Sequence, residues 1–186
     1  MKYNPDIHNR KSIRLKDYDY SQSGLYFITI CTQNKEHIFG EIINDTVGAG
    51  FSCPDNINEA KIILSEYGKI IENEIKKLNK KDPTISCEEY VIMPNHIHFI
   101  IDIKNNVKTK IGREDPAPTI GEIIGYYKFI TTKQYNEILE IKNEKYIKLW
   151  QRNYYENIIK NEKTYLMVSE YIKNNLLKWT DDKYFK

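Results

Sequence analysis

The chain has 186 residues and a net charge of +2, with 40% hydrophobic and 29% charged residues. These values are typical of a single globular domain with its own core, and so small a charge argues neither for nor against a nucleic-acid partner. No apolar run approaches membrane-spanning length and the polar N-terminus has no signal-peptide core, so we expect neither feature. Cys31, Cys53 and Cys87 lack metal-type spacing, which predicts reduced thiols in a cytosolic protein.

The first third of the chain predicts a basic arm followed by short strands. Residues 1–23 are polar and should form an irregular arm. The β-branched and aromatic run at 25–32 predicts a strand, and 37–43 predicts a short, ragged one. Residues 44–58 carry turn chemistry and predict a loop, after which 61–64 either extend a strand or lead into a helix.

Two amphipathic helices are predicted over residues 66–80 and 120–139. In both segments apolar residues recur at three- and four-residue spacing. A hydroxyl side chain stands at each expected N-cap, Ser65 for the first helix and Thr119 for the second. Each helix should therefore bury one face.

Further strands are predicted between and after these helices. Residues 85–93 and 97–103 should form neighbouring strands, followed by a basic, proline-containing loop at 104–118. Residues 147–150 predict another short strand, and 151–159 are expected to be extended or in turns.

The predicted element order indicates the fold class. Asn161 should cap a third helix that runs to about Asn175. The order is then strand, helix, strand, strand, helix, strand, helix, which fits an α+β sandwich with a mostly antiparallel sheet and helices on one face. The nearest arrangement is the ferredoxin-like one with an added C-terminal helix, formed as a single domain over residues 1–186.

The first candidate site is a pair of histidines at the start of the predicted strand 97–103, one of them directly before it. His96 and His98 share one parity, so they should leave the sheet on one accessible face. Ile97 and Phe99 share the other parity and should enter the core. Two converging neutral imidazoles can hold a divalent ion. Taken alone, however, a His-x-His pair is also a common surface feature.

The last predicted helix supplies the second candidate group. Tyr171 and Asn175 are four residues apart and lie on one helix face. Facing the histidines, an amide oxygen could complete a Mg²⁺ or Mn²⁺ site, and the phenol could attack an ion-polarised phosphate. Spacing alone also allows a half-buried core tyrosine at this position.

The sequence resembles the REP-associated tyrosine transposases, a branch of the single-tyrosine HUH transposases. Five blocks in family order carry the resemblance, at residues 10–21, 25–34, 90–98, 150–159 and 170–175. Two positions depart from the family pattern: Asn157 stands where many members carry His, and Leu176 stands where Pro usually follows the Asn pair.

The resemblance implies roles for individual residues. His96 and His98 would bind Mg²⁺ or Mn²⁺, Tyr171 would be the nucleophile, and Asn175, or failing it Asn174, would be the third ligand. The substrate would be single-stranded DNA, often beside a hairpin, cut to a 5′-phosphotyrosine and a free 3′-OH by a monomer or homodimer. The residues implied to contact DNA are Arg10, Lys11, Arg14, Trp150, Arg152 and Tyr155.

Two other functions remain open on the sequence. A ferredoxin-like sheet can bind single-stranded nucleic acid by aromatic stacking without catalysis, and the chain has 15 tyrosines, many beside Lys, Arg or Asn. A zinc hydrolase fits less well, because a third His or Cys ligand and a glutamate base are missing at motif spacing.

Overall fold

The computed structural model describes residues 23–45, 59–104 and 118–185. The predicted basic arm, with Arg10, Lys11 and Arg14, lies outside these ranges. The described helices and strands, in chain order, are β1 (Gly24–Cys31), the 3₁₀ turn η1 (Gln33–Lys35), β2 (Gly40–Asp45), β3 (Glu59–Leu64), α2 (Glu66–Lys81), β4 (Ile85–Met93), β5 (His96–Ile103), α3 (Ile120–Ile141), β6 (Tyr155–Ile159), α4 (Glu162–Asn174) and the 3₁₀ turn η2 (Trp179–Asp181).

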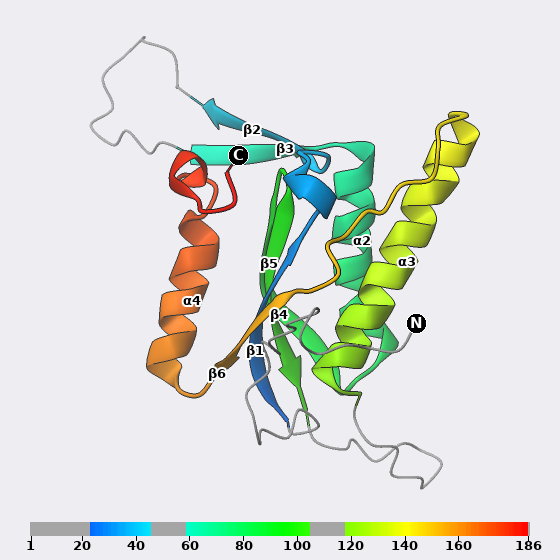
Figure 1. Cartoon of the computed structure of the whole chain (residues 1–186). Coiled ribbons are helices and arrows are strands. Elements are labelled where there is room, and N and C mark those ends of the chain that lie inside the picture. Colours follow the sequence, from blue (N-terminus) through cyan, green and yellow to red (C-terminus); the bar gives the residue numbers. More distant parts are fainter. Residues whose placement is uncertain (1–22, 46–58, 105–117, 186) are drawn as a thin grey trace, which may run out of the picture.

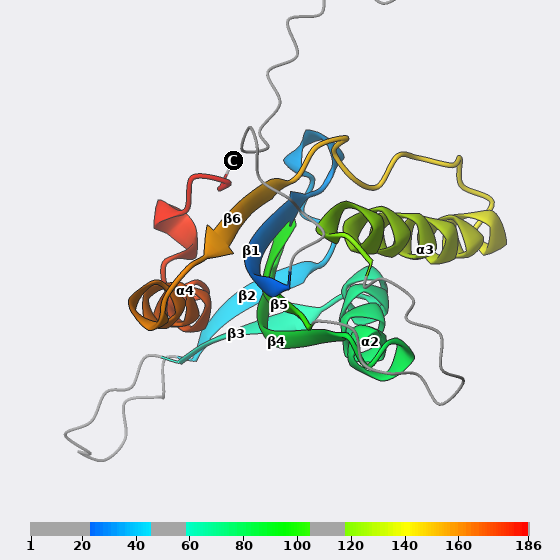
Figure 2. The ribbon, with the colours of Figure 1, turned by 90° about the horizontal axis from the view of Figure 1, so that it is seen from below.

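Four strands form the main sheet in the order β4-β5-β1-β6, with every neighbouring pair antiparallel. Helices α2 and α3 cover one face of this sheet, and α4 lies on the other (Figures 1 and 2). Among the described strands, β2 and β3 pair only with each other and form a separate two-stranded sheet. The predicted α+β fold, with a mostly antiparallel sheet and an added C-terminal helix, is confirmed.

The core lies between the sheet and helices α2 and α3. Ile97, Phe99 and Ile101 of β5 are fully buried there, as the alternation of the sequence predicted. On β1, Ile28 and Ile30 join them from the same face. Burying one such side chain contributes about 1.5–3 kcal/mol, so this face of β5 holds the strand in a single register.

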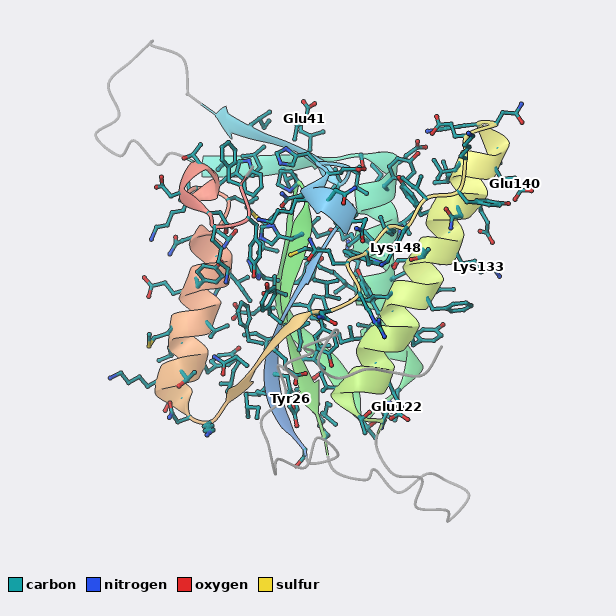
Figure 3. The ribbon with its side chains drawn as sticks, in the orientation of Figure 1. Tyr26, Glu41, Glu122, Lys133, Glu140 and Lys148 are labelled. Atoms are coloured by element: carbon teal, nitrogen blue, oxygen red, sulfur yellow. The ribbon has the colours of Figure 1, made fainter. Side chains whose placement is uncertain are left out.

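All three predicted helix caps are present. The Ser65 hydroxyl accepts a hydrogen bond from the backbone N–H of Gly68, and Asn161 caps α4 in the same way. Thr119 and Glu122 form a reciprocal capping box at the start of α3, where Figure 3 shows Glu122. A cap of this kind stabilises a helix by about 1 kcal/mol.

The last strand of the sheet differs from the prediction. The expected strand at 147–150 is wrong, because this segment makes only one isolated bridge, between Trp150 and Thr32. Residues 155–159, expected to be extended or in turns, form β6 and pair with β1 along its length. Leu149 and Trp150 gave this segment the apolar pattern of a strand, but they pack into the core from an irregular segment.

Within the described residues, no helix combines the length and the apolar character that crossing a membrane requires.

Candidate functional site

His96 and His98 lie side by side on the sheet face that α4 covers. Their Nε2 atoms are 3.0 Å apart. The exposed fractions of the two residues are 0% and 1%, so the expectation of an open sheet face is wrong. The ring of Tyr184, near the C-terminus, lies against His96 with ring centroids 4.6 Å apart. Sequence parity correctly indicated the face, but it could not indicate what covers it.

The outer nitrogen of each imidazole is held by a neighbouring side chain. Nδ1 of His96 lies 2.7 Å from Oδ1 of Asn95, the residue directly before it. Nδ1 of His98 lies 2.7 Å from Oγ1 of Thr29, its cross-strand partner on β1. Both rings therefore turn their Nε2 atoms toward the same point. A hydrogen bond to the other ring nitrogen orients histidines that bind metal ions in the same way.

Burial keeps both imidazoles neutral. Desolvation lowers the pKa of His96 to about 2, with a further contribution from His98 beside it. Desolvation likewise lowers the pKa of His98 to about 3. A neutral imidazole has a free lone pair on one ring nitrogen, which is the form that binds a divalent cation.

Helix α4 brings Tyr171 to the histidine pair. Its phenol oxygen lies 3.2 Å from Nε2 of His98, and its ring meets Phe27 edge to face. The residue is 40% exposed, so the hydroxyl is close to the histidines while the ring still borders solvent. Burial and then the charge of Asp182 raise the pKa of Tyr171, so the resting phenol carries its proton.

Asp182 is a site residue that the sequence did not reveal. Its Oδ2 atom lies 3.5 Å from the phenol oxygen of Tyr171 and 4.0 Å from Nε2 of His96. The Asp182 side chain is only 4% exposed, and with the two histidines it forms a group that could hold a metal ion. The only sequence signal is an acidic pair, Asp181 and Asp182, shortly after the tyrosine helix.

Asn175 occupies the C-cap of α4, one turn beyond Tyr171. It is 3% exposed, and its Oδ1 atom is buried without a hydrogen-bond partner. A buried amide oxygen left unpaired is costly unless a ligand satisfies it. Two imidazole nitrogens, an amide oxygen and a carboxylate form a donor set that suits Mn²⁺ or Mg²⁺. Two nitrogens bound to one ion at a right angle would also stand about 3 Å apart.

A cavity of about 740 Å³ opens over this group. Its wall includes His98, Tyr171 and Asp182. Two lysines, Lys178 and Lys183, line it together with three acidic residues, so the wall carries charges of both signs. Asn157 and Asn174 lie in the same wall, so the departure of Asn157 from the family pattern falls inside the site.

The residues implied to contact DNA are scattered. Tyr155 is 55% exposed on β6, and its ring lies 6.1 Å from that of Tyr184, at the edge of the site. Arg152 is also exposed, but it lines a separate groove beside α3 and not the cavity over the histidines. Trp150 does not fit its implied role: it is 3% exposed and its indole N–H donates to Thr131, which leaves no free ring face for a base.

Comparison with known proteins gives consistent matches. The family model described as "Transposase IS200 like" matches residues 21–175. An uncharacterised protein of Haemophilus influenzae is 37% identical over 195 residues, covering 99% of this chain and 97% of the relative. A solved REP-associated tyrosine transposase bound to a REP hairpin has a similar fold, with a TM-score of 0.52 and 17% identity over 91% of this chain and 76% of that one.

Proposed function

The chain belongs to the family of IS200-like transposases, and from that premise we propose that it cuts single-stranded DNA and transfers the cut end through a covalent 5′-phosphotyrosine on Tyr171. The observation that carries the proposal is the position of the Tyr171 hydroxyl, 3.2 Å from Nε2 of His98 in the wall of an open cavity. The closeness of a phenol to a buried histidine pair supports a role as nucleophile better than a role in packing.

The cleavage step exchanges one phosphoester for another. The Tyr171 oxygen forms a bond to phosphorus, the bond from phosphorus to the 3′ oxygen breaks, and the 3′ oxygen takes up a proton. The proton of the phenol passes to Asp182, the nearest carboxylate at 3.5 Å. The phosphotyrosine conserves the energy of the phosphodiester, so attack by another 3′-OH can rejoin strands without ATP.

A divalent cation, Mg²⁺ or Mn²⁺, fits the donor set of this site. His96, His98 and Asn175 would hold it, with Asp182 as a further oxygen donor. When bound, such an ion polarises a phosphate oxygen and offsets the charge that builds up on it. The chain itself orients both imidazoles through Asn95 and Thr29 and places aromatic rings against them, Phe27 beside His98 and Tyr184 beside His96.

The proposed substrate is single-stranded DNA beside a hairpin. The solved structure of similar fold was determined bound to a REP hairpin, and the five sequence blocks resemble the REP-associated branch. Lys178 and Lys183 at the cavity would attract the phosphates, and the exposed ring of Tyr155 would stack on a base. Arg152, which precedes Tyr155 in the chain, would contact phosphates on either side of that base.

A denaturing gel tests this proposal. The protein is incubated with Mn²⁺ and labelled single-stranded oligonucleotides that carry a hairpin, and covalent protein–DNA adducts are separated from bound complexes. We expect an adduct with wild type and with Tyr155→Phe, but none with Tyr171→Phe, which keeps the ring and removes the attacking oxygen. Tight binding without any wild-type adduct would instead favour a non-catalytic single-strand-binding domain.

A further inference from the structure

Glu89 of β4 faces helix α4, on the same side of the sheet as the histidine pair. It lies opposite Ile100 of β5, which shares its parity with His98. The register of β4 against β5 shifts between Cys87 and Glu89. On a regular strand these two residues would share one face, but the irregularity leaves Cys87 in the core and turns Glu89 toward α4.

One carboxylate oxygen of Glu89 meets three side chains of α4. Its Oε1 atom accepts from the Ser169 hydroxyl at 2.7 Å and from the Tyr165 hydroxyl at 3.4 Å. The ammonium nitrogen of Lys173 lies 3.4 Å from the same oxygen. The three residues follow one another at four-residue spacing, so they form a single stripe along about two turns of the helix.

This stripe and Tyr171 lie on opposite flanks of α4. A helix turns by about 100° per residue, so Tyr171 stands about 160° around the axis from Ser169. Val168 and Ile172 lie between the two flanks and pack on the sheet. Apolar contacts have no preferred direction, so they would tolerate a roll of the helix about its axis. Hydrogen bonds are directional, so the contacts to Glu89 resist such a roll.

The second oxygen of Glu89, Oε2, is buried, and no residue in the described part of the chain donates a hydrogen bond to it. A buried carboxylate oxygen without a partner costs stability. The contacts of Glu89 are therefore better suited to selecting one orientation of α4 than to raising the stability of the fold.

We propose that Glu89 is a positioning residue, which sets the rotation of α4 about its axis and thereby aims the Tyr171 hydroxyl at the histidine pair. It acts through the helix and not through the ion, because it holds the flank of α4 that faces away from Tyr171. The effect on catalysis rests on the proposed function, whereas the effect on the orientation of Tyr171 does not.

Proton NMR of the metal-free protein in EDTA tests the orientation directly. The rings of Tyr171 and Phe27 meet edge to face with centroids 6.0 Å apart, so their protons should give a nuclear Overhauser cross-peak. Glu89→Ala should lose this cross-peak. The cross-peak between Phe99 and Tyr127, on the other face of the sheet, should persist and show that the fold is intact. An unchanged contact of Tyr171 with Phe27 in Glu89→Ala would overturn the proposal.

The conservative variant Glu89→Gln separates the acceptor from the charge. Its amide oxygen still accepts from Ser169, so the cross-peak should be retained. In the adduct assay at saturating Mn²⁺, Glu89→Ala should react about 10–100-fold more slowly, because a misplacement of about 1 Å is enough for such a loss. Glu89→Gln should react at nearly the wild-type rate. Mn²⁺ affinity measured by calorimetry should stay close to that of wild type in both variants.

Glu72 of α2 provides the matched control. It accepts from the Tyr90 hydroxyl at 3.3 Å and pairs with Lys76 at 2.9 Å, so it makes similar contacts on the other face of the sheet. Glu72→Ala should keep the wild-type adduct rate. Equal rates in Glu89→Ala and Glu72→Ala would refute the positioning role, as would a Glu89→Gln protein as slow as Glu89→Ala. A wild-type protein without any adduct would refute the proposed function, while the NMR contact would still decide the role of Glu89.

Discussion

The phenol oxygen of Tyr171 lies 3.2 Å from Nε2 of His98, although the two residues are 73 positions apart in the sequence. The contact joins α4 to β5, and the edge of the Tyr171 ring against Phe27 of β1 supports it. α4 is also tied to β4, since the Ser169 hydroxyl donates to Oε1 of Glu89 across 2.7 Å. A helix in contact with three strands of the sheet therefore presents the candidate nucleophile to the candidate ion site.

Replacing His98 should weaken ion binding. His98→Ala removes one of two converging nitrogen donors, so Mn²⁺ affinity measured by calorimetry should fall at least about tenfold. Tyr171→Phe is the matched control, because it lies beside the pair, leaves both nitrogens in place and should bind Mn²⁺ nearly as wild type does. Unchanged Mn²⁺ affinity in His98→Ala would show that the ion binds at another site.

Replacing Asp182 should slow the chemical step. Asp182→Asn keeps the size of the side chain but cannot accept the phenol proton, so the rate of adduct formation should fall about 10²–10⁴-fold. The neighbouring Asp181→Asn is the control, because Asp181 lines the same cavity but is exposed and is not part of the group that Asp182 forms with the two histidines. If Mn²⁺ affinity falls in Asp182→Asn while the adduct rate at saturating Mn²⁺ does not, the carboxylate serves as a metal ligand alone. Equal adduct rates in the two variants at saturating Mn²⁺ would contradict its role as the base.

Acid should destabilise the metal-free protein through the buried histidines. Their pKa values are lowered in the folded state, to about 2 for His96 and about 3 for His98, from about 6.5 in the unfolded chain. The neutral forms stabilise the fold fully above about pH 6.5, and this contribution is lost as the pH falls toward the folded values. Each histidine should lower the free energy of unfolding by about 2 kcal/mol between pH 6.5 and pH 5.

Urea unfolding in EDTA at these two pH values measures this effect. His98→Gln cannot take up the proton, so the loss of unfolding free energy on acidification should be smaller by about the share of one histidine. An identical pH dependence in the variant and wild type would mean that His98 already titrates normally in the folded protein.

The N-terminal arm should contribute to DNA affinity through phosphate contacts. Removing residues 1–16 deletes Arg10, Lys11 and Arg14, so binding to single-stranded DNA should weaken. The plot of log affinity against log salt concentration should also flatten, by about 0.7 for each lost phosphate contact. An unchanged salt slope with weaker binding would indicate that the arm acts through folding and not through charge.

Local patterns were enough to predict several features of this protein. The strict alternation of β5 indicated that His96 and His98 share a face opposite Ile97 and Phe99, because side-chain direction in a strand depends only on parity. The caps at Ser65, Thr119 and Asn161 were likewise readable, since a cap bonds only a few residues away along the chain.

Features that depend on contacts between distant segments were decided only by the tertiary structure. Trp150 and Tyr155 are both aromatic and close in sequence, but one packs into the core and the other faces solvent, because only the second belongs to a strand paired with β1. Asp182 follows no motif and reaches the histidines because the segment after α4 folds back, with the Tyr184 carbonyl bonded to Asn95. Long-range packing of this kind has no periodicity, so the approach of a carboxylate to Tyr171 is set by where the chain returns and not by any local pattern of residues.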